Sequence, residues 1–197
     1  MIRIPLFAFA TILVLAAPAL TASAGEVGEA CDGCHGHDGV STRQDVPTIA
    51  GISVPVQLDA LKAFAAKTRP CRKVAAPHGG TEDMCTLAAG LSAAQIAALA
   101  DHYSKLPYAR MKQPVAAAAA ANGKSLAARE CQICHSSGGT DPTDDAGLLG
   151  GQPLGWLKRA IADMKDGKSP QPKMMQAKTS KLSDADVTAL AEYYASL

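Results

Sequence analysis

The sequence predicts an all-α protein built from two similar helical domains in tandem. The first observation is an internal repeat, in which residues 91–106 match residues 182–197 at eight of sixteen positions. The second is the spacing of apolar residues in both copies, which recur every three or four positions as on one face of a helix. The third is a five-residue motif, Cys-x-x-Cys-His, that occurs twice, 100 residues apart. Together they indicate a duplicated structural unit.

Each half of the chain begins with its Cys-x-x-Cys-His motif. This pattern is typical of c-type haem attachment, in which both cysteines hold the haem through thioether bonds. The histidine that follows can ligate the iron from one face. Two copies therefore predict two haem c groups, with His35 and His135 as axial ligands. The attaching cysteines are Cys31, Cys34, Cys131 and Cys134.

Each copy of the repeat ends in an amphipathic helix of about four turns, at 3.6 residues per turn. The helix opens with a serine, Ser92 or Ser183, which stands three residues before Gln95 or Asp186. This spacing is close to a capping box, in which two side chains satisfy the first backbone amides of a helix.

Residues 1–24 are predicted to be a cleaved signal peptide. Arg3 gives the positive start, residues 6–19 form a short apolar stretch, and Ala22-Ser23-Ala24 resembles a cleavage site. Covalent haem attachment outside the bacterial cytoplasm agrees with export. We therefore expect the mature chain in the periplasm, with an uncleaved membrane anchor as the alternative.

The composition limits the kind of core and the kind of partner. The chain has only eight aromatic residues (one Trp, four Tyr and three Phe), so each domain needs another source of large apolar surface. A buried porphyrin in each domain supplies it. Basic and acidic residues nearly balance, at 19 against 18. No basic run with interleaved aromatics predicts a nucleic-acid partner.

The first half carries an insertion that the second half lacks. The offset between equivalent positions is 100 up to Pro70 and Pro170, and 91 from Met84 onward, so nine extra residues lie between them. Cys71 and Cys85 bracket the insertion. In an oxidising compartment they predict a disulfide that closes a surface loop, although two free thiols remain the alternative.

The domain boundary is expected after Leu106. Prolines and a run of alanines follow, and alanine is the strongest helix former, so the alanine run is expected to lead into a helix. We assign residues 25–106 to the first cytochrome domain, residues 107–113 to a linker and residues 114–197 to the second domain. Domains of this size are small for an unaided core, and a covalent cofactor offsets that.

The ligand on the second face of each iron decides the chemistry. Met84 and Met175 stand at equivalent positions, each seven residues before the leucine that begins the last helix. We predict that they ligate iron from a loop opposite the histidine. Met174 is the competitor in the second half, and His78 in the insertion is the competitor in the first. Methionine with histidine raises the reduction potential, which favours one-electron transfer.

The two histidine environments are expected to differ. The carbonyl of Pro47 is well placed to accept the Nδ1–H of His35, which would fix the ring and raise its basicity. The position 100 residues on is Gly147, whose carbonyl can still accept, although the backbone there is less constrained. We therefore expect unequal haem potentials, and a difference of ~60 mV would be a tenfold bias for one electron.

Four basic residues lie on one expected helix of the second half. They have two interpretations: a solvated face, which is the default, or a docking surface for an acidic partner. They are Lys158, Arg159, Lys165 and Lys168.

The motif set resembles the dihaem cytochrome c4 family, which has two class I cytochrome c domains in tandem. CHGHDGVST, PTIAG and MCTLAAGLS carry the resemblance in the first half, and GGQPLGWLKRAIADMKDGK with MMQAKTSKLSDADVTALAEYYASL carries it in the second. The insertion is a departure from that family. The stretch CHSSGGTDPTDDAGLLGGQ is also similar to the dihaem subunit of flavocytochrome c sulfide dehydrogenases.

The resemblance implies a periplasmic one-electron carrier between respiratory partners rather than an enzyme. No acid–base or nucleophilic constellation stands near the haem motifs. The expected partners are a reductase or flavoprotein donor and a terminal oxidase or other acceptor, with peripheral association with membrane complexes left open. The alternative is the electron-accepting cytochrome subunit of a sulfide dehydrogenase-like complex, in which the chain would be a non-catalytic subunit.

Overall fold

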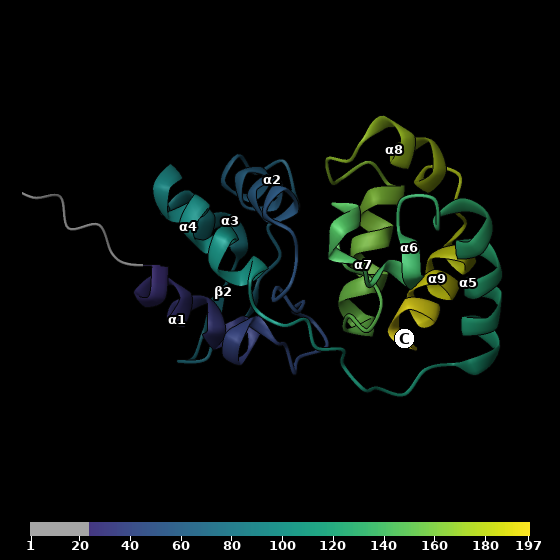
Figure 1. The fold of residues 1–197 in the computed structure, drawn as a ribbon, viewed down its shortest axis with the longest axis horizontal. Coiled ribbons are helices and arrows are strands. Elements are labelled where there is room, and N and C mark those ends of the chain that lie inside the picture. The colour runs from purple at the N-terminus through teal and green to yellow at the C-terminus, as the bar shows by residue number, and fades with distance from the viewer. Residues whose placement is uncertain (1–23) are drawn as a thin grey trace, which may run out of the picture.

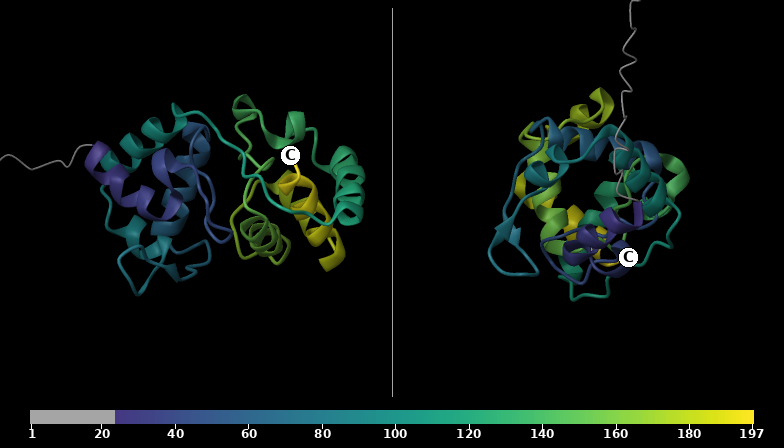
Figure 2. Two further views of the ribbon diagram at one scale, coloured as in Figure 1. Left: turned by 90° about the horizontal axis from the view of Figure 1, so that it is seen from below. Right: turned by 90° about the vertical axis from the view of Figure 1, so that its left-hand side faces the viewer.

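The computed structural model describes residues 24–197, so nearly all of the predicted signal peptide lies outside the described residues. Two groups of helices lie side by side and are joined by a long connecting segment along one edge (Figures 1 and 2). The predicted all-α fold is confirmed. In the part of the chain that the structure describes, no helix is both long enough and apolar enough to cross a membrane.

The elements of the first half are α1 (Ala24–His35), η1 (His37–Gly39), α2 (Val54–Ala65), β1 (Val74–Ala75), β2 (Thr81–Glu82), α3 (Met84–Ala89) and α4 (Ala93–Ser104). Those of the second half are α5 (Ala117–Glu130), α6 (Ser136–Gly139), η2 (Pro142–Asp144), α7 (Leu154–Lys165), α8 (Lys173–Thr179) and α9 (Asp184–Ala195).

The sequence repeat is a structural repeat. Helices α2 and α7 begin and end 100 residues apart, and helices α4 and α9 begin and end 91 residues apart. The predicted capping boxes are present at Ser92 and at Ser183, each with both reciprocal hydrogen bonds. Even single loop bonds recur: the Gly51 amide donates to the Tyr103 carbonyl, as the Gly151 amide does to the Tyr194 carbonyl. The two halves therefore share one backbone plan.

A small apolar core lies between the first and last helices of the second half. Its members are mostly alanine and branched aliphatic residues contributed by α5, α7 and α9. Gly123 lets α5 approach α9 closely, because a Cβ built at this position would lie 1.9 Å from the Ala189 carbonyl oxygen. The absence of a side chain at Gly123 thus sets the spacing of these two helices.

Replacing Gly123 with alanine is therefore expected to destabilise the protein by about 1–3 kcal/mol, the usual cost of forcing extra volume into a packed region. Denaturant unfolding of the holoprotein measures it. Gly90→Ala is the matched control, because its Cβ would meet nothing closer than 3.4 Å. Equal midpoints for the two variants would contradict the role given to Gly123.

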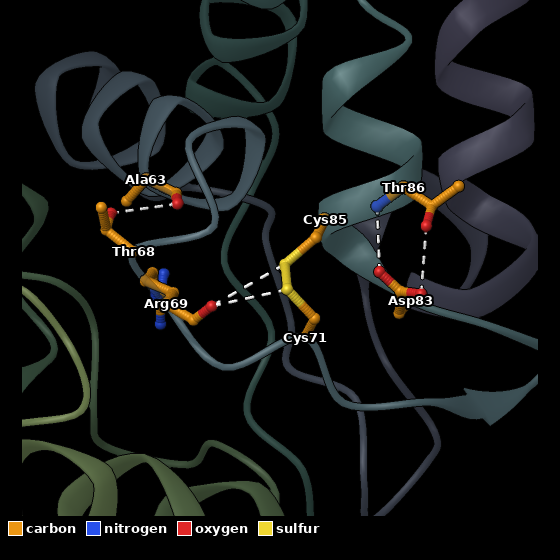
Figure 3. Close-up of a disulfide and its surroundings, with 7 residues drawn as sticks. All are labelled: Ala63, Thr68, Arg69, Cys71, Asp83, Cys85 and Thr86. Carbon is orange, nitrogen blue, oxygen red and sulfur yellow. Dashed lines mark hydrogen bonds between the residues drawn. A yellow bond between two sulfur atoms is a disulfide. The ribbon is translucent and has the colours of Figure 1, made fainter.

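The insertion in the first half folds into a β-hairpin, which the sequence did not predict. Strands β1 and β2 pair antiparallel, with Val74 opposite Glu82, and they are the β-structure of the described residues. Cys71 and Cys85 form a disulfide at the base of this hairpin, with their Cα atoms 5.4 Å apart. The carbonyl of Arg69 faces both sulfur atoms at 3.7 Å (Figure 3). The bridge thus ties the hairpin to the buried start of α3.

Replacing Cys71 and Cys85 with serine is expected to lower the free energy of unfolding by roughly 3 kcal/mol, the chain-entropy value for a loop of about fifteen residues. Thermal unfolding of the holoprotein checks this. Mild reduction of the wild-type protein is the control, because a reductant opens a disulfide but leaves thioether bonds intact. A double variant as stable as the oxidised wild type would show that the bridge stabilises nothing.

The segment between α4 and α5 is held against the second half. The Tyr108 hydroxyl donates to the Gly150 carbonyl at 2.7 Å, and the Met111 amide donates to the Gly151 carbonyl at 2.8 Å. The predicted linker, residues 107–113, falls within this segment. Helix α5 begins at Ala117, so the expected helical role of the alanine run is confirmed.

Side chains of α7 also join the two halves. Arg159 donates to the Asp45 carbonyl at 2.8 Å, and Asp163 is ion-paired with Arg72 of the insertion.

The other basic residues of this region form ion pairs within the second half. Lys158 pairs with the buried carboxylate of Glu192. Lys165 and Lys168 also pair with carboxylates, on Asp184 and Asp166. The four basic residues therefore serve contacts within the chain, which argues against the docking interpretation.

Candidate haem sites

The first Cys-x-x-Cys-His motif forms the last turns of α1. Cys31 and Cys34 are half-buried there, and His35 is only 6% exposed. The Nδ1 of His35 donates to the Pro47 carbonyl at 2.8 Å, as predicted. This bond leaves Nε2 as the nitrogen that can bind a metal. An axial ligand needs this arrangement, with one ring nitrogen fixed and the other available.

Burial controls the protonation of these side chains. It lowers the pKa of His35, and the hydrogen bond to Pro47 opposes that shift only in part. A buried neutral imidazole is the form that binds a metal. Burial likewise raises the pKa of the Cys31 and Cys131 thiols. The site therefore offers a neutral imidazole and protonated thiols.

The second motif is built differently. Helix α5 ends at Glu130, and the next four residues form consecutive turns in which the His135 amide donates to the Cys131 carbonyl at 3.0 Å. Asp144 holds the following loop by accepting bonds from both the amide and the hydroxyl of Ser136. The Nδ1 of His135 is buried without a hydrogen-bond partner among residues 24–197.

His135 is half-buried. Burial lowers its pKa, although the carbonyls of Ala146 and Gly147 lie close enough to favour the charged form. A cavity of about 180 Å³ borders the ring, between α5 and α9. The two histidine environments therefore differ in the structure: the Nδ1 of His35 donates to Pro47 at 2.8 Å, whereas the Nδ1 of His135 has the Ala146 and Gly147 carbonyls nearby but no well-aligned hydrogen bond.

Two tyrosines that the sequence analysis did not single out lie beside these motifs. Tyr103 on α4 faces Cys31, and its hydroxyl donates to the Asp32 carboxylate at 2.8 Å. Tyr194 on α9 occupies the same place opposite Cys131. Burial raises the pKa of both phenols, so they remain donors. The repeat spacing of Tyr103 and Tyr194 was the available signal for this role.

The candidate methionines lie on short helices rather than in the loops that were expected. Met84 is the first residue of α3 and is half-buried, and Asp83 caps that helix through the Thr86 amide. Met175 lies in α8 and is also half-buried, whereas the neighbouring Met174 is 73% exposed. A helix projects adjacent residues in different directions, so the exposure of Met174 and the partial burial of Met175 favour Met175 as the ligand.

The other histidines differ from these candidates in position. His78 is exposed at the turn of the β-hairpin. His37 is exposed beside the carboxylates of Asp32 and Asp38. His102 packs its ring edge-on against Tyr103, with centroids 4.9 Å apart.

Comparison with known proteins also indicates a cytochrome. Over 93% of this chain, and 85% of the relative, the sequence is 32% identical to the "Thiosulfate dehydrogenase electron acceptor" of Thiomonas intermedia (strain K12). The chain belongs to the dihaem cytochrome c4-like family. Residues 118–193 match the family described as "Cytochrome C oxidase, cbb3-type, subunit III".

Solved structures of the cytochrome c4 family have the same fold. Reduced cytochrome c4 from Pseudomonas stutzeri is 26% identical, with a TM-score of 0.71 over 88% of this chain and 96% of its own. Cytochrome c4 from Acidithiobacillus ferrooxidans, 24% identical with a TM-score of 0.68 over 86% and 99% of the two chains, agrees in fold.

A third solved structure belongs to an enzyme. The thiosulfate dehydrogenase TsdBA from Marichromatium purpuratum is 27% identical, with a TM-score of 0.68 over 84% of this chain. The match covers 36% of the TsdBA chain, so this cytochrome corresponds to about a third of that protein.

The residues of both motifs fit the cofactor of the family. This cytochrome carries haem c and acts as an electron carrier. Haem iron supplies a one-electron couple, Fe³⁺/Fe²⁺. In each half the chain offers two cysteines, a neutral imidazole that is buried (His35) or half-buried (His135), and a half-buried thioether on a separate helix. The unpartnered Nδ1 of His135 does not conflict with this, because Nε2 is the nitrogen that would face the iron.

Proposed function

We propose that this dihaem cytochrome accepts electrons from a sulfur-oxidising dehydrogenase, with thiosulfate dehydrogenase as the first candidate, and passes them to a respiratory acceptor. The observation that carries the proposal is the 32% identity with a thiosulfate dehydrogenase electron acceptor over nearly the whole chain. The likeness to part of TsdBA supports it independently, because there a similar unit occurs within a thiosulfate dehydrogenase.

The proposed electron path uses two sites of one design. Cys31 with Cys34, and Cys131 with Cys134, attach the two haems. His35 with Met84 would ligate the first iron, and His135 with Met175 the second. The burial of His35, the partial burial of His135 and the partial burial of both methionines support this set. The two domains are residues 25–106 and 114–197.

The proposed location is the periplasm, reached by cleavage of the predicted signal peptide. Sulfur-compound dehydrogenases that donate to a c-type cytochrome need it in their own compartment, and haem attachment to cysteines occurs there. The chain itself is proposed to be non-catalytic. Its role is to hold two redox groups at a distance from solvent and to transfer one electron at a time.

The test mixes the purified oxidised holoprotein with thiosulfate dehydrogenase and thiosulfate and follows haem reduction by stopped-flow absorbance. Fast reduction that depends on both enzyme and substrate supports the proposal. A second arm replaces the donor with a flavin-containing sulfide dehydrogenase and sulfide, since the stretch after His135 also resembles the cytochrome subunit of that enzyme. Reduction in the second arm alone would favour the alternative, and reduction in neither arm contradicts both.

A further inference from the structure

A single side chain of the second half forms two hydrogen bonds with the backbone of the first half. Gln152 is completely buried, and so is Thr48, 104 residues earlier in the chain. The Thr48 amide donates to Oε1 of Gln152 at 2.9 Å, and Nε2 of Gln152 donates to the Thr48 carbonyl at 2.9 Å. Both backbone groups of one residue are thereby satisfied by one amide from the other domain.

The backbone segment bound by Gln152 is also the one that accepts a hydrogen bond from His35. The amide of Thr48 and the carbonyl of Pro47 belong to the same peptide group. Its N–H donates to Gln152, and its C=O accepts the Nδ1–H of His35 at 2.8 Å. Hydrogen bonds at the two ends of one peptide polarise each other, so a bond at the N–H makes the carbonyl a stronger acceptor.

The repeat contains no equivalent contact from the first half to the second. In the repeat, the positions of Pro47, Thr48 and Gln152 correspond to Gly147, Leu148 and Ile52. Ile52 has no side-chain amide with which to return the contact. The Nδ1 of His135 lies near the Ala146 and Gly147 carbonyls without a well-aligned hydrogen bond. Among residues 24–197, the backbone that holds His35 is therefore hydrogen-bonded by a side chain of the other half in a way that the repeat does not reproduce.

We propose that Gln152 is a positioning residue for His35, so that docking of the second domain sets the reduction potential of the first haem and leaves that of the second unaffected. This inference rests on the proposed ligation of iron by His35, and it is independent of the identity of the redox partners. A strongly bonded Nδ1–H makes the imidazole a better electron donor and stabilises the ferric state. Loss of the Gln152 contact therefore raises the potential of the first haem.

The experiment compares the wild-type holoprotein with Gln152→Leu by redox titration, with the two haems resolved by their hyperfine-shifted NMR signals. The expected result is at least a threefold shift of the electron toward the first haem, about 28 mV at 59 mV per tenfold change. The second haem keeps its potential. Hydrogen exchange at the Thr48 amide speeds up, and the shift of the His35 Nδ1–H signal changes.

The matched control is Arg159→Leu. This substitution also removes a hydrogen bond across the interface, but the acceptor of that bond is the Asp45 carbonyl rather than the Pro47–Thr48 peptide. If Gln152 acts by positioning His35, Arg159→Leu leaves the reduction potential of the first haem unchanged. If Gln152→Leu does not fold, Gln152→Asn keeps the amide but shortens its reach, and the same shift is expected. An unchanged first potential, equal shifts of both haems, or the same shift in the control overturns the proposal. Absence of hyperfine shifts on the wild-type His35 ring would overturn it through the ligation itself.

Discussion

Replacing Met84 with alanine lowers the reduction potential of the first haem and leaves the second near its original value. A thioether ligand favours ferrous iron, so its loss stabilises the ferric state. The expected fall is on the order of 100 mV or more, within the roughly 0.8 V that axial ligands span. Met175→Ala has the same effect on the second haem alone. Redox titration, together with loss of the methionine-to-iron absorption band, measures both.

Met174→Ala is the matched control. This side chain is adjacent to Met175 but 73% exposed, so its removal is expected to change neither potential. A fall in the second potential with Met174→Ala and none with Met175→Ala would reverse the assignment in the second half. If Met84→Ala changed nothing, the first iron would need another ligand, and His78→Ala would then be the informative variant.

Much of the fold could be predicted because the duplicated sequence carries it twice. The last helices, their capping boxes and the helix of the alanine run after the linker follow from periodicity and from local residue preferences, which act over a few neighbouring positions. The bond between His35 and Pro47 was also within reach, because proline fixes the backbone close to the motif.

The predictions that were wrong concern short elements. The methionines were expected in loops, but α3 and α8 form there, with α3 started by the cap of Asp83. The insertion was expected to be a plain loop, but it pairs as a hairpin of two residues per strand. Segments this short have no periodicity, so their structure depends on what they pack against.

Contacts between the halves could not be predicted at all. The Gln152–Thr48 pair and the Arg72–Asp163 ion pair each join single residues of segments far apart in the sequence. A single contact residue produces no periodicity or motif in the sequence around it. The basic residues of this region illustrate the same limit. Their charge suggested an exposed face, but Lys158 and Lys165 of α7, and Lys168 just beyond it, pair with carboxylates of the same chain.

Removing the second haem attachment, with Cys131→Ser and Cys134→Ser together, is expected to unfold the second half as well as to lower the mass by one haem. The core there consists largely of alanine and aliphatic residues around Leu157 and Leu190, in a domain of a size that rarely folds on such a core alone. Intact-protein mass spectrometry and far-ultraviolet circular dichroism measure the two effects.

Ile133→Ser is the matched control for that variant. Ile133 lies between the two cysteines and is 87% exposed, so its replacement alters the motif's surface without touching a sulfur. It should keep both haems and full helicity. Because Gln152 belongs to the half that unfolds, the double cysteine variant should also raise the potential of the remaining first haem, in the same direction as Gln152→Leu. A double variant that loses one haem yet keeps its helices would mean that the apolar side chains alone hold the second domain together.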